Sequence, residues 1–276
     1  MKRTFALFLV FIMLLTLAAC GGRQPGDDEN IQSSGQEANN REPEPGDALS
    51  DEGDGIVYAS YEAYDNAWSD FNSYIINKSE GHEIVSVHQS TVMPIGLKNF
   101  TYLLPLSFLG QSYAMSGKFD PDLEAGMLQK AWSKDVKLSY DENQGYLLTG
   151  TDDAGSALEL KVRYDKKSDS LRLEAYKDGA LELLFEYCKT PDGYAAQYHC
   201  QDVVGMDKTD AVYGLCTYRL IFAGENGSCS RFDNVTSEPD SIYGGGFDKQ
   251  SFIEGATHFF TIADGEFAGK LGGQDF

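Results

Sequence analysis

The spacing of apolar residues changes along this chain, from a helical period to a strand-like period near residue 135. In the first part, large apolar side chains recur at spacings of three and four residues, which is the period of an amphipathic helix. These residues are Tyr61, Tyr64, Trp68, Phe71 and Ile75. An aromatic stripe with this spacing is most often the buried face of a helix, so we expect it to pack into the core.

A second, shorter helix is predicted from the stretch FDPDLEAGMLQKAW. Asp120 is a suitable N-cap, Pro121 suits the first helical position, and Asp122 places an acid in the first turn. The residues expected on its buried face are Leu123, Met127, Leu128, Ala131 and Trp132.

After residue 135 the apolar period becomes two, which predicts β-strands. Polar turn segments begin at residues 141, 152, 165, 177 and 189, so they follow one another at intervals of 11 to 13 residues. Between them apolar residues alternate with charged ones, which predicts a run of hairpins with one buried face and one wet face. Further strands are expected near residues 194–201, 211–223 and 228–235, followed by a hairpin that turns at residues 264–265.

Together these elements predict an α+β fold, in which the N-terminal amphipathic helix and the second short helix pack on a curved antiparallel meander sheet. A twisted sheet of many strands tends to curl, so we expect a half barrel or a barrel. This order of elements resembles the architecture of periplasmic lipoprotein carriers and, less closely, of lipocalins. The resemblance is one of architecture, without a shared sequence motif, and it implies a concave sheet face that can hold a ligand.

The first 20 residues differ from the rest of the chain. Lys2 and Arg3 precede an apolar run over residues 5–19, which ends in the sequence LAAC. The run is shorter than the roughly 20 residues that cross a membrane, and its pattern is typical of an export signal. The sequence LAACGG resembles the lipobox of bacterial lipoproteins. In that family the cysteine receives a diacylglyceryl group, which implies a signal peptide over residues 1–19 and a lipid on Cys20 that anchors the chain to the extracytoplasmic face of the cell membrane.

Residues 20–55 follow as an acidic segment without aromatic residues, and we expect them to be a disordered tether. The remaining residues, 56–276, suit one domain, and their 33 acidic and 18 basic residues give it a net charge of −15. Because such a charge repels phosphate, we expect no binding to nucleic acid. The expected partners are the membrane, through the lipid on Cys20, and an unidentified small ligand or envelope protein.

Four cysteines remain in the predicted domain: Cys188, Cys200, Cys216 and Cys229. None belongs to a C-x-x-C motif, and the sequence predicts neither a metal site nor a cofactor. Cys200 and Cys216 are equally distant from Lys208 in a predicted hairpin turn, so we expect them to face each other. Either these two form a disulfide, which an extracytoplasmic location allows, or all four cysteines are buried thiols.

Catalytic motifs are missing from the chain. Neither G-x-S-x-G nor H-E-x-x-H occurs, and His199 and Cys200 are adjacent, so on a strand they point to opposite faces. We therefore assign no catalytic residue and favour a protein that is not an enzyme.

Residues 92–115 are more apolar than a strand with one wet face requires. This segment is either a buried crossover beneath the sheet or the lining of an apolar cavity. The residues expected to line such a cavity are Phe100, Tyr102, Leu103, Leu104, Leu106 and Phe108. A cavity predicts a lipoprotein that binds a lipid, another amphiphile or a small ligand in the concave sheet face. The alternative is an interaction or structural module that binds a cell-wall component or a protein partner of the envelope.

Overall fold

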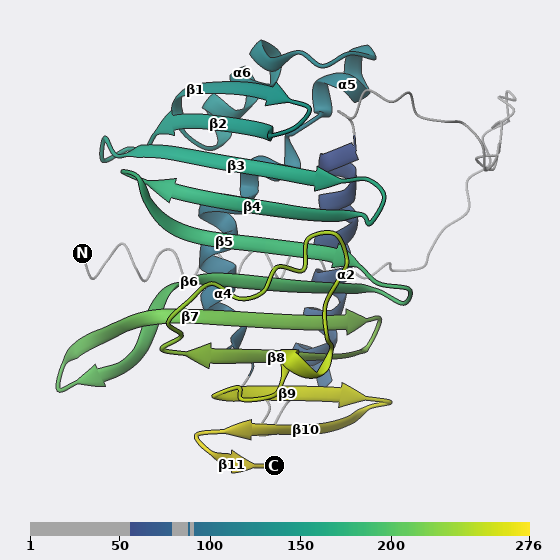
Figure 1. The fold of residues 1–276 in the computed structure, drawn as a ribbon, viewed down its shortest axis with the longest axis vertical. Helices are drawn as coiled ribbons and strands as arrows, with labels where there is room; N and C mark the ends of the chain where they lie inside the picture. The colour runs from purple at the N-terminus through teal and green to yellow at the C-terminus, as the bar shows by residue number, and fades with distance from the viewer. Residues whose placement is uncertain (1–55, 79–87, 89–90) are drawn as a thin grey trace, which may run out of the picture. The chain divides into compact units, whose positions relative to one another are not determined.

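Eleven β-strands form one antiparallel sheet, in which each strand pairs with the next one along the chain (Figure 1). The computed structural model describes residues 56–78, 88 and 91–276, which belong to one compact unit. The strands are β1 (Lys134–Asp141), β2 (Gly145–Thr151), β3 (Ala157–Asp165), β4 (Ser170–Lys177), β5 (Ala180–Lys189), β6 (Tyr194–Asp207), β7 (Asp210–Ala223), β8 (Asn226–Asp233), β9 (His258–Ala263), β10 (Glu266–Leu271) and β11 (Gln274–Asp275). The predicted meander is confirmed, and its turns fall where the polar segments predicted them.

The helices that the structure describes come almost entirely before the sheet in the chain. They are α2 (Ile56–Lys78), α4 (Met93–Lys98), the π-helix η1 (Asn99–Leu103), the 3-10 helix η2 (Leu104–Ser107), α5 (Gln111–Ser116), α6 (Pro121–Ala131) and the 3-10 helix η3 (Gln250–Phe252). None of the helices in the described residues is long and apolar enough to cross a membrane. The predictions for the signal peptide, Cys20 and the tether concern residues outside the described part.

Helix α2 covers one face of the sheet, which we call the inner face. The predicted stripe lies on the buried side of α2, where none of its five residues is more than 7% exposed. The ring of Tyr64 stacks on that of Tyr187 at 4.6 Å, and Phe71 stacks on Phe222 at 5.6 Å. Phe71 also lies so close to β8 that a Cβ on Gly227 would approach its ring to 2.7 Å. Aromatic pairs of this kind stabilise a core beyond the area that they bury.

The opposite face, which we call the outer face, is covered in its middle by residues 234–257. We call this segment the strap, and Figure 1 shows it crossing the strands in front of the sheet. A small second core lies beneath it, formed by Cys188, Ala195, Ile242 and Phe252. The sequence predicted a wet outer face, and this prediction is wrong for β5 and β6, because residues 183–188 and 194–200 are buried on both faces.

The strap is fixed to the sheet by a buried carboxylate. Glu186 is fully buried, and its oxygens accept hydrogen bonds from Ser241 Oγ at 2.6 Å and from the backbone N–H of Ile242 at 2.9 Å. The same carboxylate pairs with Arg172 Nη1 at 2.6 Å and accepts from Gln197 Nε2 at 2.7 Å. Four donors therefore satisfy a charge that would be costly to bury alone.

Two further details of the predicted architecture are wrong. The sheet is not closed, because β1 and β11 lie at opposite ends of the strand order, so a barrel is excluded. On α6, Leu123 and Ala131 are exposed although they were expected on the buried face, whereas Glu124 is fully buried. Glu124 points inward because its carboxylate accepts hydrogen bonds from the backbone N–H groups of Gly110 and Ser112 at the start of α5. The predicted N-cap is present, since Asp120 accepts from Leu123 N at 3.0 Å.

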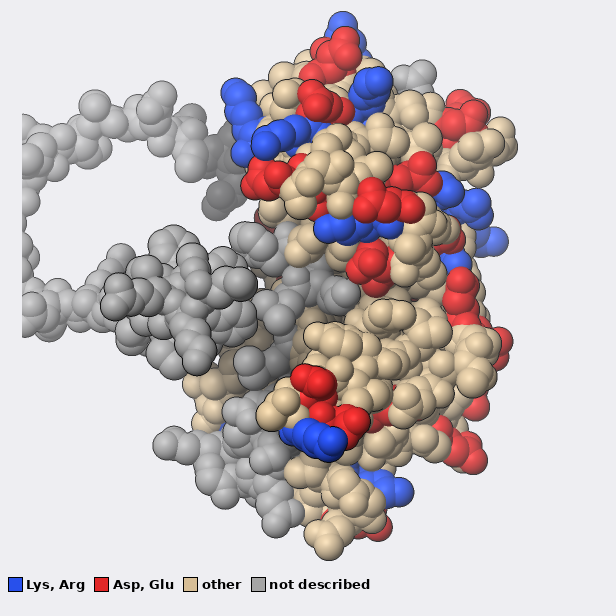
Figure 2. Space-filling view, turned by 90° about the vertical axis from the view of Figure 1, so that its left-hand side faces the viewer, with Lys and Arg blue, Asp and Glu red and all other residues tan. Residues whose placement is uncertain are grey.

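A two-stranded arm extends beyond the sheet between β6 and β7. The last β6 residue paired with β5 is Cys200, and the first β7 residue paired with β8 is Cys216, so within the sheet residues 201–215 pair only with each other (Figure 1). Of the ten large apolar side chains exposed in the described part, half lie on this arm: Val203, Met206, Val212, Tyr213 and Leu215. Figure 2 shows acidic and basic side chains interspersed over one side of the domain, with a broad uncharged area between them.

Candidate functional site

The residues predicted to line an apolar cavity lie in the segment that follows α4. Tyr102, Leu103 and Leu106 are at most 6% exposed and belong to the main core together with the α2 stripe. Leu104 is half-buried and Phe108 packs against the same core, while the side chain of Phe100 lies outside the described part. These positions match the buried crossover, which was the alternative interpretation of residues 92–115. The lining of a ligand cavity by these side chains stays a prediction.

The register of β6 and β7 places Cys200 directly opposite Cys216, as the sequence predicted. Both side chains are buried, and the structure records them, with Cys188 and Cys229, as thiols rather than as disulfides. Burial raises the pKa of the Cys216 thiol to about 12, against the opposing effect of Arg231. A thiol with such a pKa is a poor nucleophile at neutral pH.

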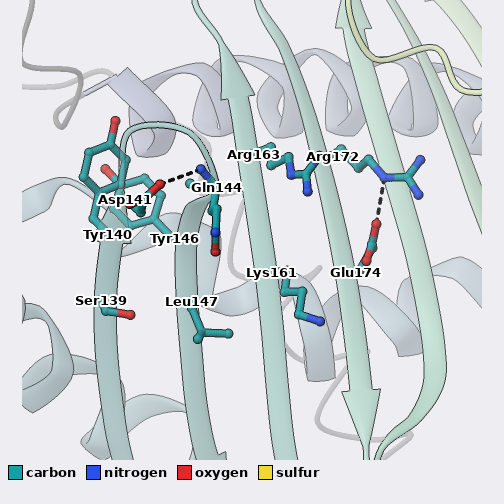
Figure 3. A pocket seen from close by; sticks show the side chains of 11 residues that line it. Ser139, Tyr140, Asp141, Gln144, Tyr146, Leu147, Lys161, Arg163, Arg172 and Glu174 are labelled. Carbon is teal, nitrogen blue, oxygen red and sulfur yellow. Dashed lines mark hydrogen bonds and ion pairs between the residues drawn. The ribbon is translucent and has the colours of Figure 1, made fainter.

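A hollow on the outer face lies over the first four strands. Its volume is about 470 Å³, within the range of sites for small ligands. Figure 3 shows its side chains standing on neighbouring strands and on the turn between β1 and β2. Those that matter most are Gln144, Leu147, Lys161, Arg163, Arg172 and Glu174. The meander brings them together, because residues directly opposite on antiparallel strands share a face: Leu147 pairs with Lys161, and Lys161 with Glu174.

Two of the three basic side chains in this hollow have acidic partners. Arg172 Nε lies 2.9 Å from Glu174 Oε1, and its Nη1 bonds the buried Glu186. Lys161 Nζ lies 3.1 Å from Glu159 and 4.7 Å from the centre of the Tyr176 ring. Burial alone raises the pKa of Glu174, but the hydrogen bonds from Tyr176 and Arg172 hold it below its ordinary value. This carboxylate is therefore ionised at neutral pH.

Arg163 is the third basic side chain of the hollow. It is exposed, and among the described residues it makes no hydrogen bond or ion pair. A smaller hollow of about 140 Å³ meets the first one at Arg163, and Tyr243 of the strap lines it. Burial raises the pKa of the Tyr243 phenol, and Asp165 raises it further. Arg163 lies close enough to Tyr243 to lower this pKa and so opposes both effects. The strap and the sheet thus both contribute to the surroundings of Arg163.

A second polar cluster, near the end of β8, lacks the arrangement of a catalytic site. Cys216 Sγ lies 3.4 Å from Asp233 Oδ1, and His258 Nε2 lies 3.8 Å from Asp233 Oδ2. The carboxylate thus stands between thiol and imidazole, whereas activation of a nucleophile needs the imidazole next to it. Arg231 Nε already occupies Asp233 at 2.6 Å. Within the described residues, no group of three or more His, Cys, Asp or Glu side chains could hold a metal ion.

The outer-face hollow offers hydrogen-bond donors, an exposed leucine and one cation that has no acidic partner among the described residues. Sequence reasoning missed this hollow. A signal was present, because Lys161 and Arg163 are two residues apart on one strand, as are Arg172 and Glu174 on the next, so each pair lies on one charged face. What the sequence lacked was the register that aligns these strands. No family model matches the chain, and neither a curated protein nor a solved structure matches it.

Proposed function

We propose that this chain is a lipid-anchored extracytoplasmic module, not an enzyme, that binds a component of the cell envelope in the outer-face hollow. The proposal follows the second of the two functions expected from the sequence. The first of these functions, binding of a lipid or small ligand, needs a cavity on the concave face of the sheet, which we take to curve around α2 as a half barrel. The stacked rings of Tyr64 and Tyr187 fill that face at its centre, which favours the outer face as the site of binding.

The observation that carries the proposal is the position of the hollow. It lies over β1 to β4, beside the strap, and most of its polar side chains stand on strands that the meander holds in fixed register. A site on paired strands is rigid, so a ligand need not order it on binding. Lys161, Arg163 and Gln144 can donate hydrogen bonds, while Leu147 offers an apolar contact of the kind that a sugar ring or a peptide side chain can use.

Co-sedimentation with isolated cell walls tests this function. The full chain, purified from membranes in detergent, is incubated with walls and the bound fraction is measured against protein concentration. Leu147→Asp changes the hollow, whereas Leu215→Asp makes the same change on the arm, where the leucine is 37% exposed compared with 38% for Leu147. We expect Leu147→Asp to weaken binding about tenfold or more, the effect of losing about 1.4 kcal/mol, and Leu215→Asp to leave it unchanged. Equal binding by all three proteins, or none by the parent, contradicts the proposal.

The anchor is tested separately. Cys20→Ala removes the only thiol in the LAAC sequence, so the chain should leave the membrane fraction and lose the mass of a diacylglyceryl group. Fractionation and intact-mass measurement report both effects. Retention of Cys20→Ala in the membrane fraction, with a mass lower than that of the parent only by one sulfur atom, would exclude the lipid on Cys20.

A further inference from the structure

Two arginines stand directly opposite each other on the outer face, Arg163 on β3 and Arg172 on β4. Like charges in such a cross-strand pair destabilise a sheet unless other groups neutralise them. Arg172 is neutralised three times, by Glu174 at 2.9 Å, by Glu186 at 2.6 Å and by Glu238 at 3.6 Å. Arg163 shares none of these contacts. Within the described residues, the pair therefore leaves the guanidinium of Arg163 without a carboxylate partner.

The acids that line the same hollow are already engaged. Glu174 accepts from Arg172 Nε and, at 2.8 Å, from the hydroxyl of Tyr176. Asp141 closes the turn between β1 and β2, where its Oδ1 accepts from the backbone N–H groups of Asn143 at 2.9 Å and Gln144 at 3.0 Å. The donors of Arg163 are thus the largest unused hydrogen-bonding capacity among the described residues that line the larger hollow. A planar guanidinium matches a carboxylate with two parallel bonds.

Space for such a group exists beside Arg163. Gly145 lines both hollows next to it and contributes no side chain, and glycine is required there because a Cβ would approach Val162 O to 2.1 Å. Tyr243 of the strap lines the smaller hollow from the other side. An acceptor group can therefore reach the guanidinium from the larger hollow while the rest of the ligand remains over Leu147 and Lys161.

We propose that Arg163 binds a single carboxylate of the ligand by a bidentate ion pair. This inference rests on the proposed function, because it names the chemical class of the ligand in the same hollow. One negative charge is specified because the domain carries a net charge of −15, which repels a polyanion from beyond contact distance. A small monoanion gains the local pair and experiences little of that repulsion. The carboxylate can belong to an acidic sugar or to the end of a short peptide, which share this chemistry.

The test uses four probes with the full chain in detergent micelles, observed by saturation-transfer NMR of the probe. Glucuronic acid and N-acetylalanine carry the carboxylate on a sugar and on an amino acid, while glucose and N-acetylalanine amide are their uncharged counterparts. We expect at least one acid to bind at least tenfold more tightly than its uncharged counterpart, and the stronger acid to identify the source. We expect this preference to weaken as salt is raised.

Variants separate the guanidinium from the hollow around it. Arg163→Gln should reduce the affinity for the preferred acid about tenfold or more, and Arg163→Lys should give an intermediate loss, since lysine keeps the charge but not the planar fork. Lys130→Gln, which removes an exposed cation on α6, should have no effect. Acids that bind no better than their uncharged counterparts, or an Arg163→Gln variant that binds like the parent, would overturn the carboxylate assignment.

The two proposals fail differently. If cell walls bind the parent and Leu147→Asp abolishes this binding while Arg163→Gln does not, the hollow remains the binding site and only the carboxylate assignment is lost. If no wall binds but the acids still select Arg163, the carboxylate site stands and the proposed envelope function is lost.

Discussion

At the scale of single residues, the ring of Tyr64 joins α2 to the sheet. It stacks on Tyr187, and its hydroxyl lies 3.0 Å from that of Tyr198. We expect Tyr64→Ala to lower the free energy of unfolding by about 3–5 kcal/mol, because a large cavity opens in a packed core, and Tyr64→Phe to lower it by about 1 kcal/mol. Urea denaturation measures both. The control is Tyr213→Ala, at a tyrosine that is 65% exposed, which should change the free energy of unfolding by less than about 0.5 kcal/mol.

The buried Glu186 gives a second prediction at this scale. Glu186→Gln leaves the guanidinium of Arg172 without its shortest ion pair and weakens two bonds to the strap, so we expect a loss of about 3 kcal/mol in the free energy of unfolding. The matched control is Glu238→Gln, which removes a partner of the same arginine that is 54% exposed and 3.6 Å away. Its expected cost is at most about 1 kcal/mol. Similar losses for both variants would mean that Glu186 does not hold the strap.

At the scale of elements, the arm formed by residues 201–215 and the body of the sheet differ in stability. A hairpin without neighbouring strands is marginal in water, whereas residues 194–200 of β6 have β5 and β7 on either side. We expect backbone amides of residues 202–213 to exchange with solvent about 100-fold faster or more than those of residues 195–199. Hydrogen exchange followed by mass spectrometry resolves the two peptides. Equal protection would show that something else supports the arm.

The strap is the element that sequence patterning missed, and the reason lies in particular residues. The outward positions of β3 are Glu159, Lys161 and Arg163, but those of β5 include Leu184 and Cys188, which are apolar. This loss of charge on alternate positions was a usable signal that something covers β5. Which segment covers it could not be predicted, because residues 234–257 show no helical or strand period. The two residues of this segment that bond Glu186, Ser241 and Ile242, are 55 and 56 residues away from it in the sequence.

At the scale of the whole molecule, three buried or half-buried histidines make stability depend on pH. Burial lowers the pKa of His88, His199 and His258 from the ordinary value of 6.5, and for the last two nearby acids offset part of the effect. Below pH 6.5 the unfolded chain therefore binds protons that the folded chain does not, so the free energy of unfolding falls as the pH is lowered. Above about pH 7.5 both states are neutral at these sites and the effect vanishes.

We expect the free energy of unfolding to decrease between pH 7.5 and pH 5.5, by at most about 1.4 kcal/mol per pH unit for each histidine. Urea denaturation at the two pH values measures the decrease. His199→Gln should make it smaller, since His199 is only 3% exposed and its imidazole contacts Thr217. A decrease that His199→Gln leaves unchanged would assign the pH dependence to other groups.

The sequence by itself determined the local elements of this protein. The stripe on α2, the cap at Asp120, the hairpin turns and the opposition of Cys200 and Cys216 all follow from periodicity and turn chemistry, which act between near neighbours in the chain. The apolar composition of residues 92–115 likewise indicated that Tyr102, Leu103 and Leu106 are buried. They also predicted the export signal, which lies outside the described residues.

Only the tertiary structure decided whether the sheet closes, which face the strap covers and where a hollow remains. These depend on contacts between distant residues: β1 and β11 never meet, and Glu186 draws Ser241 and Ile242 onto the outer face. That Arg163 has no acidic partner among the described residues is likewise a tertiary fact, because its neighbour Arg172 takes its carboxylates from β4, from β5 and from the strap. The order of residues along one strand does not show which charged side chains form ion pairs, because these pairs depend on the register of the strands and on the path of the strap.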